Sequence, residues 1–133
     1  MKIHGLPQLI ADYKNGNANV RLYSDGTKII NTDEDDFRFD FPNNTDVTIT
    51  HKCDKCCQYC YLGCNPDGEH ADILAPGFLD SLHPGVELAI NLNDMTHPQL
   101  SKFLTTMRER GIVVNGTINQ YHFMKYHKVL KGL

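Results

Sequence analysis

The side chains with the clearest chemical potential are five cysteines, and all of them lie between Cys53 and Cys64. A disulfide framework spreads its cysteines along the chain, and five thiols would leave one unpaired. Thiols this close together are instead typical of a site that binds a metal through sulfur. We therefore interpret this segment as a metal-binding loop.

The segment directly before the cysteines predicts a strand. Residues 46–50, Asp-Val-Thr-Ile-Thr, are rich in β-branched side chains and lead straight into Cys53. Two further strands are predicted at 86–90 and at 112–119, with helices between and after them. Strands that alternate with helices indicate a parallel sheet, and ligand sites gather at the carboxyl ends of its strands. The cysteines are therefore expected at that edge.

Two helices are predicted in this part of the chain. The first begins at Thr96, whose side chain would form a capping box with Gln99, and ends at Gly111. Its buried face is predicted from apolar residues at helical spacing, which are Leu100, Phe103, Leu104 and Met107. The second helix is predicted over 123–131, with a buried side made of Met124, Val129 and Leu130.

The first 45 residues follow a different pattern. Asp25-Gly26 lies between the alternating runs 20–23 and 27–30, which predicts a β-hairpin. Residues 37–41 alternate at the period of a strand, whereas residues 1–19 have too little periodicity to assign. The chain of 133 residues is thus predicted to be an α/β protein with an N-terminal β-hairpin extension, 1–45, and a βα domain, 46–133.

The cysteine spacing is specific enough to suggest a family. Cys53, Cys57 and Cys60 follow the pattern C-x3-C-x2-C, with Tyr59 just before the last cysteine, and this arrangement resembles the radical S-adenosylmethionine superfamily. The resemblance implies that the three thiolates hold a 4Fe-4S cluster whose fourth iron binds S-adenosylmethionine. It also implies reductive cleavage of that cofactor to a 5′-deoxyadenosyl radical, with Tyr59 beside the adenine.

The resemblance extends to two later positions. Family members place a glycine-rich turn after the second strand, where this chain has Asn91, Asn93 and no glycine, and polar residues after the third, where it has Thr117 and Asn119. These four side chains are the expected cofactor contacts. Family barrels have six βα units and this chain has about three, which implies a partial barrel. The chain is then a fragment, is completed by a second copy or a partner chain, or binds a cluster without catalysis.

Alternatives remain for the cysteines. Cys56 and Cys64 have no role in the family pattern, and Cys53-x2-Cys56 with Cys57-x2-Cys60 offers four thiolates for a structural zinc. A non-enzymatic iron–sulfur or zinc module that assembles with a partner is therefore the second hypothesis. The sequence is compatible with a complete radical enzyme and with an incomplete part of one. It does not identify the substrate.

Composition limits the other classes. The net charge of -3 comes with no basic stripe, so a nucleic-acid partner is unsupported. No apolar run approaches the roughly 20 residues of a membrane helix, and no secretory signal is recognisable, so a cytoplasmic protein is expected. The seven histidines are scattered, and His51 beside the loop is read as a polar residue at a strand end. The family resemblance further implies an electron donor as a partner.

Overall fold

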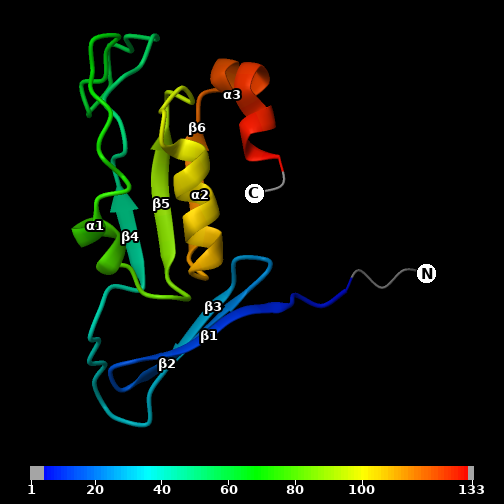
Figure 1. The fold of residues 1–133 in the computed structure, drawn as a ribbon. Coiled ribbons are helices and arrows are strands. Elements are labelled where there is room, and N and C mark those ends of the chain that lie inside the picture. The colour runs from blue at the N-terminus through cyan, green and yellow to red at the C-terminus, as the bar shows by residue number, and fades with distance from the viewer. Residues whose placement is uncertain (1–4, 132–133) are drawn as a thin grey trace. The chain divides into compact units, whose positions relative to one another are not determined.

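The computed structural model describes residues 5–131, so residues 1–4 and 132–133 at the ends of the two predicted domains lie outside it. The chain forms two compact units that divide between Asn43 and Asn44. Each unit has its own three-stranded sheet (Figure 1). The fold class is therefore mixed α/β, with one antiparallel and one parallel sheet.

The N-terminal unit contains the antiparallel sheet. Its strands β1 (Leu9–Asn15), β2 (Ala18–Tyr23) and β3 (Lys28–Asn31) pair in the order β1-β2-β3. The predicted hairpin is confirmed as β2 and β3, because Gly26 has a positive φ of 88° at the turn and Asp25 Oδ1 accepts from Thr27 N–H at 2.9 Å. Strand β1 extends this hairpin within the segment for which the sequence predicted no element.

The predicted strand 37–41 is wrong, because that segment has no regular structure. Its backbone is held by a side chain instead of a neighbouring strand. Asn15, which is fully buried, accepts from the amides of Asp40 and Phe41 at 2.8 and 3.2 Å and donates to the Phe41 carbonyl at 2.6 Å. These bonds satisfy backbone groups that a strand would have paired in a ladder.

The turn between β1 and β2 explains why this segment lies where it does. Gly16 has a positive φ of 59°, and a Cβ there would come within 1.7 Å of the Arg38 carbonyl oxygen. Asn17 follows, donating its backbone N–H to the same carbonyl at 3.1 Å and accepting from Arg38 N–H at 2.8 Å. Only glycine allows this close approach of two backbones.

The C-terminal unit contains a parallel sheet of strands β4 (Asn44–Val47), β5 (Glu87–Leu92) and β6 (Val113–Ile118), in that order. Helix α1 (Pro76–Asp80) precedes β5, α2 (Leu100–Glu109) joins β5 to β6, and α3 (Gln120–Tyr126) continues into a 3₁₀ turn, His127–Leu130. The alternation of strands and helices is as predicted, but the first strand, predicted at 46–50, begins at Asn44 and ends at Val47. The sheet is open and does not close, so the finer description as a partial barrel is not confirmed.

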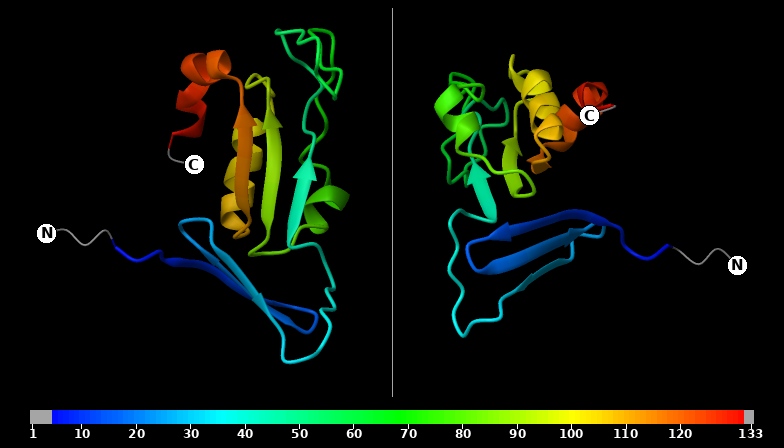
Figure 2. Two further views of the ribbon diagram at one scale, coloured as in Figure 1. Left: turned by 180° about the vertical axis from the view of Figure 1, so that it is seen from behind. Right: turned by 60° about the horizontal axis from the view of Figure 1, so that its bottom comes forward.

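The two faces of the parallel sheet differ. Helices α1 and α2 cover one face, and no helix lies on the other in the described part of the chain (Figure 2). Leu88, Ile90 and Leu92 of β5 are buried on the helical face, where they join Phe103 and Met107 of α2 in the core. The opposite face carries polar or small side chains at paired positions of the three strands. They are Asp46, Ala89, Asn91, Asn115 and Thr117.

Two details of the predicted helices are wrong. Gln99, not Thr96, is the N-cap of α2, and no side chain caps that helix. Asp94 Oδ1 accepts hydrogen bonds from the backbone N–H and the hydroxyl of Thr96, at 2.8 and 2.5 Å. The Gln99 side chain accepts from Ile73 N–H at 3.0 Å. Both capping-box residues are therefore engaged elsewhere.

The buried side predicted for the last helix is only partly right, because Val129 and Leu130 are half-buried whereas Met124 is not buried. The Met124 side chain is 68% exposed, and the buried residue of α3 is His122. No helix between residues 5 and 131 has the length and apolarity needed to cross a membrane.

Candidate metal centre

The cysteine loop leaves the sheet at the carboxyl end of β4, where the β5 turn and the start of α3 also lie (Figure 1). Two short backbone pairings close its base. Thr50 pairs with His70 and Lys52 pairs with Asn65, and Cys53 N–H donates to the Asn65 carbonyl at 2.9 Å. The loop is therefore a closed excursion from residue 53 to residue 64.

A glycine beneath a carbonyl allows this base to close. A Cβ on Gly68 would lie 2.0 Å from the His51 carbonyl oxygen, which itself accepts from Asn65 N–H at 3.1 Å. The His51 side chain is exposed. Its backbone, not its imidazole, takes part in the loop.

The thiols divide between the base and the tip of the loop. Cys53 and Cys64 at the base are buried, Cys60 is half-buried, and Cys56 and Cys57 at the tip are exposed. Within residues 5–131 no three His, Cys, Asp or Glu side chains lie close enough together to hold a metal ion. The predicted ligands Cys53, Cys57 and Cys60 thus share one loop but do not converge in this structure.

The pKa values of two thiols are shifted in opposite directions. Backbone N–H groups of Cys64 and Leu62 donate to the Cys60 sulfur and lower the pKa of that thiol, which favours the thiolate that binds metals. Burial raises the pKa of the Cys64 thiol, and its contact with Cys60 adds to this. The donor set therefore fits a thiolate-bound iron–sulfur cluster in its chemistry.

One residue at the tip of the loop has a strained backbone conformation. Cys56 has a φ of 48°, and among residues 5–131 it is the only non-glycine residue with positive φ. This conformation is unfavourable for side chains other than glycine and asparagine.

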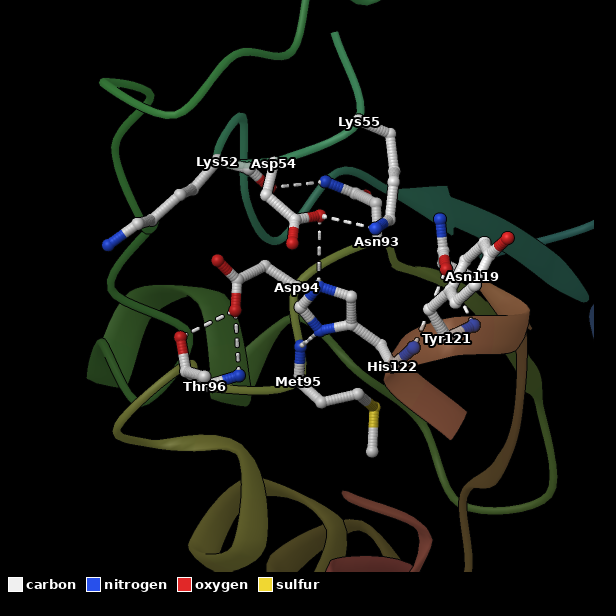
Figure 3. A network of polar contacts seen from close by, with 10 residues as sticks. All are labelled: Lys52, Asp54, Lys55, Asn93, Asp94, Met95, Thr96, Asn119, Tyr121 and His122. Carbon is white, nitrogen blue, oxygen red and sulfur yellow. Dashed lines mark hydrogen bonds and ion pairs between the residues drawn. The ribbon is translucent and has the colours of Figure 1, made fainter. Parts of the chain in front are cut away.

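Asn91 and Asn93 hold the segment 49–52, which leads from β4 into the loop. Asn91 Oδ1 accepts from Ile49 N–H at 2.7 Å, and its Nδ2 donates to the Thr50 carbonyl at 2.8 Å and to Asn93 Oδ1. Asn93 Nδ2 donates to the Lys52 carbonyl at 2.6 Å (Figure 3). These amides take over where the backbone pairing of β4 with β5 stops after Val47 and Ile90.

A cavity of about 560 Å³ lies beside these residues on the polar face of the sheet. Its volume is in the range of small-molecule sites. The four strand-end residues predicted to contact a cofactor all line it, together with two residues of the cysteine loop: Asn91, Asn93, Thr117, Asn119, Tyr61 and Leu62. Tyr59 does not line it, and its side chain is 92% exposed at the loop tip.

Asn119 has a second role as the N-cap of α3. Its Oδ1 accepts from Tyr121 N–H at 2.8 Å and from His122 N–H at 3.4 Å. Capping by asparagine is a common way to satisfy the first amides of a helix. The cap fixes the first turn of α3 at the end of β6, next to the cavity.

The sequence did not predict the contact between this helix turn and the cysteine loop. His122 Nε2 lies 3.2 Å from Asp54 Oδ1, and this contact lowers the pKa of the Asp54 carboxyl (Figure 3). Lys55 places its ammonium 4.4 Å from the centre of the Tyr121 ring. The partners are far apart in the chain and carry no shared motif, so no sequence signal indicates the pairing.

A pair of histidines fastens the outgoing arm of the loop to the start of α2. The rings of His70 and His97 have centroids 4.6 Å apart. His70 Nδ1 lies 2.8 Å from Thr50 Oγ1, and His97 Nε2 lies 2.9 Å from the Ala71 carbonyl. Burial lowers the pKa of His70, and the neighbouring His97 lowers it further. Both rings are structural in this arrangement.

Comparison of the chain with protein-family models, with curated proteins and with solved structures found no match.

Proposed function

We propose that this chain is a radical S-adenosylmethionine-type protein whose loop 53–64 binds a 4Fe-4S cluster through Cys53, Cys57 and Cys60. The observation that carries the proposal is the position of the C-x3-C-x2-C segment. It follows a parallel strand at its carboxyl end, and the next two residues of its loop, Tyr61 and Leu62, line a cavity together with Asn91 and Thr117. Parallel sheets bind their ligands at this edge.

The residues divide the tasks of such a site. Cys53 and Cys60 are the more enclosed ligands, and Cys60 is biased toward its thiolate. Cys57 is exposed and would have to turn inward to join them. When bound, the cluster supplies one electron for the reductive cleavage of S-adenosylmethionine to methionine and a 5′-deoxyadenosyl radical. The polar lining of the cavity, with Asn119 and Thr117, would bind the hydroxyl and amino groups of the cofactor.

The open sheet also belongs to the proposal. Only three parallel strands are present between residues 44 and 131, and the polar face of the sheet has no covering helix there. Three strands alone leave the cofactor open to solvent on one side. A second copy or a partner chain that adds strands to the sheet would enclose it. An electron donor is a further required partner, since the cluster must be reduced before each cleavage.

The test begins with anaerobic purification of the full chain and reconstitution with iron and sulfide. We expect close to four irons and four sulfides for each chain, with broad visible absorption. Cys53→Ala, Cys57→Ala and Cys60→Ala should each lose most of the iron, whereas Cys56→Ala should keep it. A protein that takes zinc and no sulfide would contradict the proposal.

A second candidate function is supported by the position of Cys64. Its side chain contacts Cys60 and is affected by the charge of Cys53, so a fourth cysteine lies near two of the three proposed ligands. Four thiolates would give a zinc or saturated cluster module without an open metal position. Formation of 5′-deoxyadenosine from S-adenosylmethionine under reducing conditions distinguishes the two, because a saturated module forms none.

A further inference from the structure

His122 joins three segments that are distant in the chain. It is 8% exposed and lies in the first turn of α3, which Asn119 caps. Its ring faces the turn after β5 through Met95 and the cysteine loop through Asp54 (Figure 3). A buried polar side chain needs partners for its hydrogen-bonding atoms, and both ring nitrogens have one.

The two contacts define the tautomer of this ring. Met95 N–H points at His122 Nδ1 at 3.3 Å, so Nδ1 must be the acceptor and Nε2 must carry the hydrogen. Nε2–H then donates to Asp54 Oδ1 at 3.2 Å. The ring is thus oriented by the β5 turn and has its donor directed at the loop.

A neighbouring pair strengthens the same junction. Lys55 lies over the ring of Tyr121, and its ammonium is 3.6 Å from Asp54 Oδ1. Two consecutive loop residues are therefore held by two consecutive residues of α3. Both loop residues lie between Cys53, which is buried, and Cys57, which is exposed.

From this placement we infer that His122 is a positioning residue for the cysteine loop: through Asp54, with Tyr121 acting on Lys55, it sets the direction in which the chain leaves Cys53 and so where Cys57 lies. The inference rests on the proposed function for its consequence, which is cluster binding. The loop contact itself is independent of any metal. His122 acts through Asp54 and touches no thiol among the contacts of the described residues.

The chemistry of the ring provides a matched pair of variants. In His122→Gln the side-chain amide can still reach Asp54, whereas in His122→Asn the shorter side chain can keep the Met95 contact but not the Asp54 contact. Met124→Gln, at an exposed position of the same helix, is the control for α3 itself.

The first readout is tryptic cleavage after Lys55 in the metal-free chain, compared with cleavage after Lys102 in α2. We expect His122→Asn to accelerate cleavage after Lys55 about threefold, because one hydrogen bond to the exposed Asp54 carboxylate is lost, and His122→Gln to restore the wild-type rate. Met124→Gln should match the wild type. Equal cleavage after Lys55 in the wild type and in His122→Asn would overturn the inference.

The second readout is iron bound per chain after reconstitution, which we expect to fall in His122→Asn and to recover in His122→Gln. If the wild-type chain binds no iron and no sulfide, the proposed function is wrong and so is the expected effect of His122 on cluster binding. The cleavage rates would still decide whether His122 positions the loop. If His122→Asn does not fold, Tyr121→Leu replaces it at an exposed position, and an unchanged cleavage rate there would equally overturn the inference.

Discussion

Both units of this protein hold an irregular stretch of backbone with two asparagines that are two positions apart. In the N-terminal unit Asn15 and Asn17 bind the segment around Arg38 and Phe41. In the C-terminal unit Asn91 and Asn93 bind residues 49–52, which lead into the cysteines. The first segment carries no thiol and the second is followed by five. The same amide chemistry therefore holds residues 38–41 in one unit and, in the other, the residues that lead into the cysteine loop.

Both units also contain a glycine packed against a backbone carbonyl, and substitutions of these glycines are expected to have the largest effects. Gly16→Ala places a Cβ against the Arg38 carbonyl at a positive φ, and Gly68→Ala places one against the His51 carbonyl. Each should destabilise its own unit by about 3 kcal/mol, measured by hydrogen exchange resolved along the chain. Only Gly68→Ala should also reduce iron binding.

Two other glycines serve as controls for this prediction. Gly26 has a positive φ but open space around it, and Gly77 has open space in helix α1. Gly26→Ala should cost about 1 kcal/mol from backbone strain alone, whereas Gly77→Ala should be neutral or slightly stabilising, because alanine favours a helix more than glycine does. A cost for Gly16→Ala no greater than that for Gly26→Ala would contradict the close approach.

Substitutions of the asparagines are expected to have the next largest effects, and to affect iron binding in only one of the two units. Asn15→Ala and Asn91→Ala each leave backbone groups unpaired, and each should lower the free energy of unfolding by about 2 kcal/mol in chemical denaturation. We expect iron binding to be unchanged in Asn15→Ala and reduced in Asn91→Ala. Reduced iron in both variants would mean that general destabilisation, not loop orientation, controls binding.

Cys56 sharpens the comparison within the loop. Cys56→Gly relieves the positive φ and should stabilise the metal-free protein by about 1 kcal/mol in thermal unfolding. The variant should keep its iron if Cys53, Cys57 and Cys60 are the ligands. Loss of bound metal would instead favour the zinc arrangement that uses Cys56.

The smallest expected effect is a change in pH dependence at the arm of the loop. The pKa of His70 is lowered in the folded state by burial and by His97, with Asp94 opposing, so the unfolded chain binds the proton more readily. The resulting stability is complete above the ordinary histidine pKa of about 6.5 and is lost as the pH falls below that value toward the folded pKa. His70→Asn should flatten the loss of stability between pH 7 and pH 5, followed by denaturant titration. An unchanged slope would assign the pH dependence to other groups.

Local patterns predicted much of the fold. The Asp25-Gly26 hairpin, the strand before Cys53 and the apolar face of α2 follow from turn chemistry and hydrophobic spacing. The Gly16-Asn17 turn, a known hairpin signal, could have revealed β1 in the same way. The strand predicted at 37–41 failed because a buried asparagine distant in the chain satisfied its backbone, which no local pattern records.

The candidate site was predictable only in part, for a similar reason. The edge of the sheet and the residues lining the cavity follow from strand order, because the carboxyl ends of parallel strands lie together. The contact of His122 with Asp54 spans 68 residues and depends on the cap at Asn119. The actual bonding of Asn91 and Asn93 to the incoming strand likewise depends on tertiary structure that spacing does not encode.

The pairing at the base of the cysteine loop has a consequence for the order of folding. Lys52 and Asn65 are close in the chain, so closing this base costs little chain entropy and can occur early. The groups that orient the loop, from Asn91, Asn93 and His122, are 41 to 68 residues away from their partners in it and must arrive later. We therefore expect the thiols to be assembled as a local unit first and turned toward the sheet afterwards, so that metal capture and final orientation are separable events in time.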